Sequence, residues 1–213
     1  MRKVLAAVAC TLAAALSGCI TASWPAGSLS IDGFHTCTSG KDQQQTGLDR
    51  TKYRCALAGE ELRFRFDVVD ADVCTVPAEE IKHPLDIAGG DRVEVYFVPD
   101  AEMKKPYHCV EIDADGRVLS YFVDEKKHFD WFWKFATLKV KTGRTKEGYF
   151  VEGSVSRAEL ESFGIDLRSF HMGVFRAEMS APGKVGRWCS AAPIRLPAHF
   201  HQPAMMFPVS LCK

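Results

Sequence analysis

Two pairs of side chains in this sequence have the types and the spacing needed to bind a small polar ligand. The first pair, Trp131 and Trp133, stands within an aromatic run. Residues two apart on an extended segment face the same way, and flat aromatic faces pack against the C–H bonds of a sugar ring. This pair therefore predicts a stacking platform for a saccharide. The alternative is a core strand or an edge loop whose tryptophans are buried for packing.

The second pair, Arg176 and Glu178, has the same spacing on a segment rich in apolar residues. Glu94 could join them if its own segment lies alongside, and Trp188 could form a wall of the same pocket. Such charged groups would bind the hydroxyls of a sugar. The alternative is a structural ion pair inside the protein, since a buried charge must be paired, with Trp188 packed beside Cys189.

Catalysis is not expected from this sequence. Glycoside hydrolysis needs two carboxylates at a suitable distance, and the candidates are Glu94, Glu111, Glu152 and Glu178. However, the chain has no Gly-x-Ser-x-Gly elbow, no His-Glu-x-x-His motif and no glycine-rich phosphate loop. We therefore expect a binding protein rather than an enzyme.

The first twenty residues have the features of an export signal. Arg2 and Lys3 precede an apolar run over residues 4–16, which is too short to span a bilayer and ends in small residues. Leu16-Ser17-Gly18-Cys19 then resembles the lipobox of bacterial lipoproteins, which implies cleavage before Cys19 and lipid on that cysteine. Acyl chains there would anchor the protein to the cell envelope, and Ile20 in the next position favours the outer membrane. An ordinary signal peptide that contains a cysteine is the alternative.

The remaining chain is long enough for one large domain. Removal of residues 1–18 leaves 213 − 18 = 195 residues. We assign residues 19–30 to the lipidated cysteine and a tether, and residues 31–213 to a domain outside the bilayer, because no second apolar stretch approaches membrane-spanning length. The chain has 27 basic and 27 acidic residues, and the signal removes two basic ones, leaving 25 against 27. This near-neutral balance argues against a nucleic-acid partner.

The cysteine count indicates disulfides. Of eight cysteines, Cys10 leaves with the signal and Cys19 takes lipid, so six remain: Cys37, Cys55, Cys74, Cys109, Cys189 and Cys212. An even number in an oxidising compartment predicts at least two disulfides, and six cysteines allow 15 pairings among which the sequence does not choose. A metal site is a weaker interpretation, since no Cys-x-x-Cys occurs and the histidines are scattered.

Period-two patterns of apolar and polar residues dominate the domain. They predict half-buried strands at residues 62–68, 93–97, 109–112 and 138–141, with a hairpin turn at Asp115-Gly116. A long strand is expected over residues 170–179, and a closing strand over residues 207–212 after a proline-rich segment. One short helix is predicted after Ser156, with Glu159 completing a capping box and an end near Gly164. The fold class is therefore all-β, an antiparallel β-sandwich with one short helix.

Seven segments follow one another in the order found in the family 9 carbohydrate-binding modules and their relatives, which the domain resembles. They lie at residues 31–33, 62–73, 91–97, 107–116, 148–155, 174–178 and 200–207. The sequence Asp91-Arg92-Val93-Glu94-Val95-Tyr96-Phe97, for example, is similar to the "DsvEiff" strand of the family. The resemblance implies a non-catalytic saccharide-binding sandwich, serving the capture or degradation of a polysaccharide. A structural calcium ion would be compatible with it.

The sequence also departs from the family pattern. The segment Ile87-Ala88-Gly89-Gly90 has no aromatic residue where the family has a sugar-clamping one, and Trp188 is slightly out of register with the expected tryptophan. A structural or protein-binding lipoprotein that has lost sugar binding is therefore one alternative. Another is a haem-binding electron-transfer domain, because relatives of this sandwich bind haem through Met and His. Haem is not expected, but its candidate ligands are Met172 or Met179 with His108, His171, His199 or His201.

Overall fold

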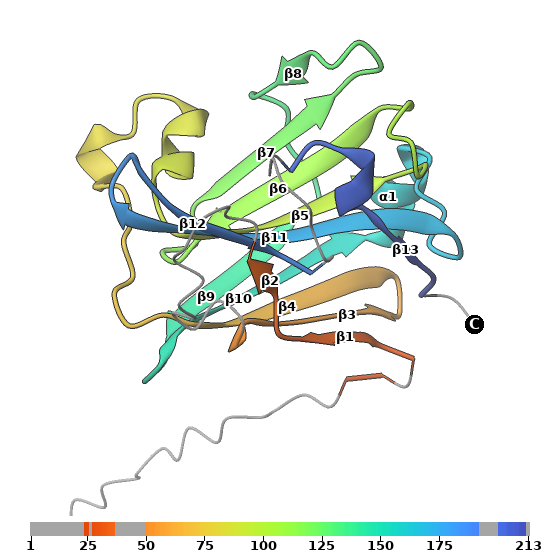
Figure 1. The fold of residues 1–213 in the computed structure, drawn as a ribbon. Helices are drawn as coiled ribbons and strands as arrows, with labels where there is room; N and C mark the ends of the chain where they lie inside the picture. The colour runs from red at the N-terminus through yellow and green to blue at the C-terminus, as the bar shows by residue number, and fades with distance from the viewer. Residues whose placement is uncertain (1–23, 26, 37–49, 192–199, 212–213) are drawn as a thin grey trace, which may run out of the picture.

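The structure, a computed structural model, describes residues 24–25, 27–36, 50–191 and 200–211, which form two antiparallel β-sheets (Figure 1). The first sheet, here called sheet A, has five strands in the order β1-β3-β4-β10-β9. Their bounds are Leu29–Asp32 for β1, Lys52–Ala58 for β3, Glu61–Val69 for β4, Gly148–Ser156 for β10 and Lys139–Arg144 for β9.

The second sheet, sheet B, has the order β2-β12-β11-β5-β6-β7-β8, with β13 paired to β11 beside β12. The bounds are His35–Thr36 for β2, Lys184–Ser190 for β12, Phe170–Ala181 for β11, Arg92–Val98 for β5, Tyr107–Asp113 for β6, Val118–Val123 for β7, Phe129–Asp130 for β8 and Phe207–Val209 for β13. Strands β13 and β12 share one edge of β11, where β13 pairs with its first residues and β12 with its later ones.

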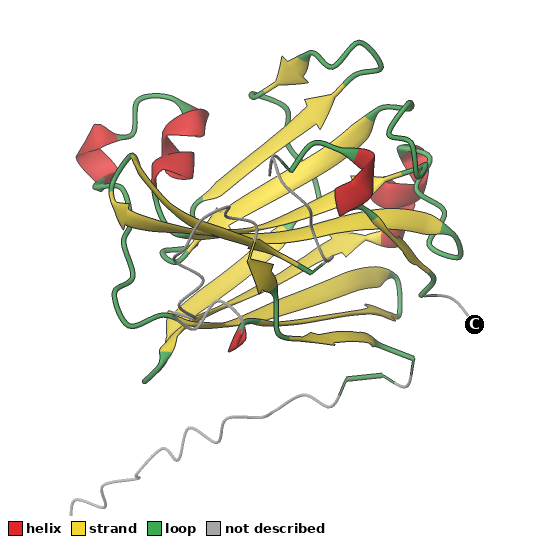
Figure 2. Cartoon of the chain, viewed as in Figure 1, coloured by secondary structure: helices red, strands yellow, loops and turns green. Residues whose placement is uncertain are grey.

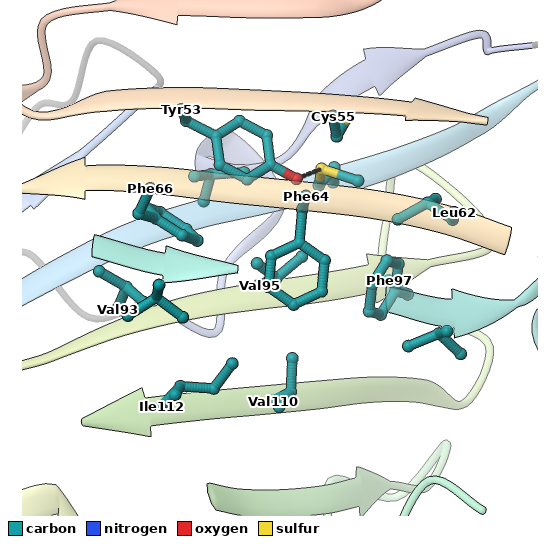
Figure 3. Close-up of a cluster of buried hydrophobic side chains, with 14 of the residues drawn as sticks. Tyr53, Cys55, Leu62, Phe64, Phe66, Val93, Val95, Phe97, Val110 and Ile112 are labelled. Atoms are coloured by element: carbon teal, nitrogen blue, oxygen red, sulfur yellow. Dashed lines mark hydrogen bonds between the residues drawn. The ribbon is translucent and has the colours of Figure 1, made fainter. Parts of the chain in front are cut away.

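The core lies between the two sheets and follows from the period-two pattern (Figure 3). Leu62, Phe64 and Phe66 of β4 face Val93 and Val95 of β5, and each is at most 1% exposed. Full burial of such a side chain stabilises the fold by about 1.5–3 kcal/mol relative to exposure. The predicted antiparallel β-sandwich is thus confirmed.

Short helices lie at the margins of the sheets (Figure 2). The α-helix α1 covers Arg157–Ser162, and three 3-10 helices cover Ala78–Glu80 (η2), Pro84–Gly89 (η3) and Pro203–Met205 (η4). Ser156 caps α1 as predicted, since its Oγ accepts a hydrogen bond from the backbone N of Glu159 at 3.1 Å. The capping box is half wrong, however, because the Glu159 carboxylate accepts from Ala136 and Thr137 instead.

Strand β12 was not among the strands that the sequence predicts. It lies in the segment interpreted as a proline-rich link between the last two strands, and it carries Trp188. In the described part of the chain, no helix is long and apolar enough to cross a membrane.

The prediction of at least two disulfides is wrong. Cys55, Cys74 and Cys109 are free thiols, so at most one pair remains among the other three cysteines. Cys55 packs between the sheets, whereas Cys109 packs on the opposite face of sheet B, and a disulfide needs Cα atoms within about 7 Å. Cys37 and Cys212 lie outside the described residues, as does Cys19.

Candidate functional site

The two faces of sheet B have different environments. One face packs on sheet A, and the other, here called the outer face of sheet B, carries a second cluster of buried side chains. Paired residues on neighbouring strands point to the same side, and Glu94 of β5 pairs with Phe175 of β11 and Glu111 of β6. Two residues further along β5, Tyr96 also points to the outer face. It pairs with Cys109 of β6, which in turn pairs with Tyr121 of β7.

An arginine lies between two carboxylates on this outer face. Arg92 Nε donates to Glu111 Oε2 at 2.6 Å, and Arg92 Nη1 donates to the carbonyl of Ala88 in η3 at 2.7 Å. Arg92 Nη2 lies 3.0 Å from Glu94 Oε1, yet that oxygen is buried and accepts no hydrogen bond from a described residue. The charge of Arg92 therefore holds Glu94 Oε1 without a well-aligned hydrogen bond.

Burial and crowding change the protonation of this cluster. The pKa of Glu94 is raised from 4.5 to about 8, mainly by desolvation and then by the charge of Glu111, against which Arg92 and Tyr96 act. The nearby carboxylates hold the pKa of Arg92 above its usual range despite its burial. Glu94 is therefore protonated near neutral pH, and the cluster as a whole is close to electroneutral.

A chain of hydrogen bonds leads from Glu94 to a histidine. Tyr96 Oη donates to Glu94 Oε2 at 2.8 Å, and Tyr121 Oη donates to Tyr96 Oη at 3.0 Å. His201 Nε2 lies 3.2 Å from Tyr96 Oη, and His201 Nδ1 lies 3.0 Å from Tyr107 Oη. Because the hydroxyl protons of Tyr96 and Tyr121 are already used, this geometry is satisfied by the His201 tautomer with its proton on Nε2.

Aromatic side chains surround the polar cluster. Trp188 of β12 is half-buried beside Phe200, with ring centroids 5.2 Å apart, and its indole N–H has no partner among the described residues. Trp131 packs on Tyr121 at 4.6 Å and is also half-buried. The neighbouring Phe132 is 68% exposed. The outer face of sheet B thus combines half-buried aromatic side chains with a charged cluster that is almost fully buried.

The structure separates Trp131 from Trp133, so the predicted platform of two tryptophans is wrong. Residues 131 and 132 form a turn rather than an extended segment. Trp131 packs on the outer face of sheet B, whereas Trp133 packs with the inter-sheet core, on His108 at 4.6 Å and on Phe135 at 4.7 Å.

Arg176 and Glu94 also lie on opposite faces, which corrects the predicted grouping. Arg176 is fully buried between the sheets and donates to Thr51 Oγ1, to the carbonyl of Val69 and to Asp70 Oδ2 at 2.9–3.0 Å. Arg176 therefore forms a structural ion pair with Asp70. This is the alternative to ligand binding that the sequence left open. Glu178 is half-buried on β11, in register with Arg187 of β12.

The haem-ligand candidates are dispersed. Met172 is buried between the sheets, where its sulfur accepts a hydrogen bond from Tyr53 at 3.1 Å, whereas His201 lies on the outer face of sheet B. His108 is stacked on Phe163 at 4.1 Å, and burial lowers its pKa to about 4. His199 lies outside the described residues. Among the residues that are described, no group of three His, Cys, Asp or Glu side chains is placed to hold a metal ion.

Sequence reasoning missed most of the polar cluster. Arg92 is two residues from Glu94 on one alternating strand, which was a signal that the two share a face. Glu111 is on the next strand, and only the register places it beside Glu94. Tyr96 and Tyr121 occur within strands and give no separate signal in the sequence. His201 could not have been placed, because it is remote in sequence from Tyr107 and Tyr96 and reaches them only through the closing segment.

The fold defines a class, the two-sheet antiparallel β-sandwich, and solved structures share this fold. A protein from Bacteroides uniformis that is proposed to bind carbohydrate matches with a TM-score of 0.61 and 16% identity, over 84% of this chain and 86% of that one. A family 9 carbohydrate-binding module from Caldicellulosiruptor kristjanssonii matches in complex with glucose (TM-score 0.47, 14% identity, 85% and 90% covered) and with cellotriose (0.46, 15%, 84% and 87%). No family model and no curated protein sequence matches the chain. At these identities the likeness shows the fold alone.

Proposed function

We propose that this protein is a non-catalytic carbohydrate-binding protein of the cell envelope, which holds a saccharide on the outer face of sheet B. The observation that carries the proposal is the ion-paired cluster of Arg92, Glu94 and Glu111, which lies among aromatic side chains. A guanidinium beside carboxylates offers donors and acceptors to vicinal hydroxyls, and aromatic rings pack on the C–H faces of the sugar.

The charge of the cluster favours a neutral sugar. Arg92 is paired with the Glu111 carboxylate while Glu94 is neutral near pH 7, so an acidic sugar would meet no excess positive charge. The Trp188 indole N–H, which has no partner among the described residues, is complementary to one hydroxyl oxygen. Small side-chain adjustments on binding would bring it within reach of a ligand.

Calorimetric titration of the whole chain with glucose and with cellotriose tests the proposal. We expect saturable binding that Glu111→Gln weakens at least tenfold, because Arg92 would lose its charged partner beside the ligand. Trp131→Phe should weaken binding severalfold, whereas the matched variant Trp133→Phe should leave it unchanged, because Trp133 packs with the inter-sheet core. Equal effects of the two tryptophan variants, or no binding by the folded protein, would contradict the proposed site.

The envelope location is part of the proposal and rests on the lipobox-like segment Leu16-Ser17-Gly18-Cys19. Mass spectrometry of the N-terminal peptide from cells should find diacylglycerol on Cys19, and none in Cys19→Ser. An unmodified peptide that begins elsewhere would instead indicate an ordinary signal peptide. A haem titration belongs beside the sugar titration, since a Soret band with defined stoichiometry would favour the electron-transfer alternative.

A further inference from the structure

Sheet A carries a basic cavity at the end where β3 begins, β4 ends and β10 begins. Its volume is about 280 Å³, and Arg50, Lys52 and Arg54 line it together with Asp67 and Tyr149. Lys52 and Arg54 point away from sheet B, because their neighbours Tyr53 and Cys55 fill the core between the sheets. The cavity is thus separated from the outer face of sheet B by that core.

The cations of this cavity are poorly balanced by carboxylates. Asp67 is already engaged by Arg65, whose Nε and Nη2 donate to its Oδ1 at 2.9 Å and 2.6 Å. Lys52 Nζ lies 3.9 Å from Asp32 Oδ1, with both side chains more than half exposed, so that pair contributes little. In the part of the chain that the structure describes, no ion pair is formed by Arg50 or Arg54.

The strand register places Arg54 of β3 directly opposite Arg65 of β4. Arg65 already pairs with both nearby carboxylates, Asp67 and Glu152, so neither forms an ion pair with Arg54. Tyr149 lies at the end of the cavity where β10 begins, with its side chain in the core between the sheets. An anion with several oxygen atoms would relieve the repulsion between the cations.

We propose that this cavity binds a phosphate group, carried by a lipid headgroup or by a phosphorylated solute. Arg50 and Arg54 would each offer a planar pair of donors to two phosphate oxygens, and Lys52 would add a compact charge. A carboxylate has only two oxygen atoms to share among three cations, so phosphate matches the donor set better. This inference does not rest on saccharide binding, which uses the opposite sheet.

The test is a titration of the whole chain with inorganic phosphate at constant ionic strength, followed by amide NMR. We expect saturable shifts centred on Arg50, Lys52 and Arg54, and an affinity at least tenfold lower in Arg54→Gln. Lys126→Gln, which removes one exposed cation from the loop between β7 and β8, is the matched control and should bind like the parent. Lys52→Gln is a second variant in case Arg54→Gln fails to fold.

Two further arms identify the source of the phosphate. Glucose 6-phosphate is compared with glucose in solution, and phosphatidylglycerol vesicles are compared with phosphatidylcholine vesicles, both with Cys19→Ser so that no acyl chain contributes. Preference for glucose 6-phosphate supports a phosphorylated solute, and Arg54-dependent sedimentation with phosphatidylglycerol supports a headgroup. Non-saturating shifts with phosphate, or equal affinities for Arg54→Gln and Lys126→Gln, would overturn the proposal whatever the sugar titration shows.

Discussion

Replacement of Arg176 by methionine tests whether this residue is structural, as its burial indicates. The guanidinium is 0% exposed and makes hydrogen bonds to Thr51, Val69 and Asp70. Methionine keeps part of the apolar stem but leaves the buried Asp70 carboxylate without its cation. Removal of one partner of a buried pair costs about 3–5 kcal/mol, out of a total stability of about 5–15 kcal/mol for a typical domain.

Urea unfolding of Arg176→Met should therefore show a loss of about 3–5 kcal/mol. The matched control is Arg168→Met, whose ion pair with Asp166 is exposed and should be worth less than about 1 kcal/mol. Combining Asp70→Asn with Arg176→Met should cost less than the sum of the single changes by about 1–3 kcal/mol, because both remove one interaction. A loss for Arg176→Met below about 1 kcal/mol, or strict additivity, would refute the assignment.

Three other predictions follow from the same geometry. The pKa of Glu94 is about 8 in the folded protein, above its ordinary value of 4.5. Between these two pH values the folded state holds a proton that the unfolded chain releases. The free energy of unfolding should therefore fall by up to about 5 kcal/mol as pH rises from about 4.5 to about 8. Glu94→Gln should remove that part of the fall in pH-dependent urea unfolding, and an unchanged slope would count against it. Gly153→Ala should destabilise the protein by about 1–3 kcal/mol, because its Cβ would lie 2.1 Å from Phe64 Cζ; a loss below about 0.5 kcal/mol would mean that Phe64 moves freely. Unreduced, denatured protein should react with a thiol reagent at Cys55, Cys74 and Cys109 at least, whereas fewer than three reactive thiols would show that they pair.

The strands were predictable because each buried face imposes strict alternation. Residues 62–68 and 93–97 alternate without a break, and they form the centre of β4 and β5. Strand β5 is buried on both faces but still alternates in sequence, because one face carries apolar side chains and the other carries Arg92, Glu94 and Tyr96. Strand β12 was not predicted because its sequence, with one glycine between charged residues and one tryptophan, lacks that alternation.

The candidate site was harder to predict because it depends on register. The sequence shows that Arg176 and Glu178 share one parity, but not which face of sheet B that parity occupies. The pairing of Phe175 with Glu94 places Glu94 on the outer face and Arg176 between the sheets, and a shift of one residue would have reversed both. Spacing likewise assigned Trp131 and Trp133 to one side, because it assumes an extended segment where the chain turns.

The order of the strands separates the two proposed sites in space and relates both to the proposed anchor. Strand β1 pairs with β3 at the edge of sheet A (Figure 1). The same sheet carries the basic cavity. If Cys19 is lipidated, residues 19–28 are the whole link to β1 and span at most about 36 Å when fully extended. The anchor would then hold sheet A within reach of anionic headgroups and leave the outer face of sheet B accessible to a saccharide.

Because a different sheet supplies each site, Arg54→Gln should leave glucose binding intact and Glu111→Gln should leave phosphate binding intact. Loss of both affinities in either variant would show that the two faces are coupled through the core.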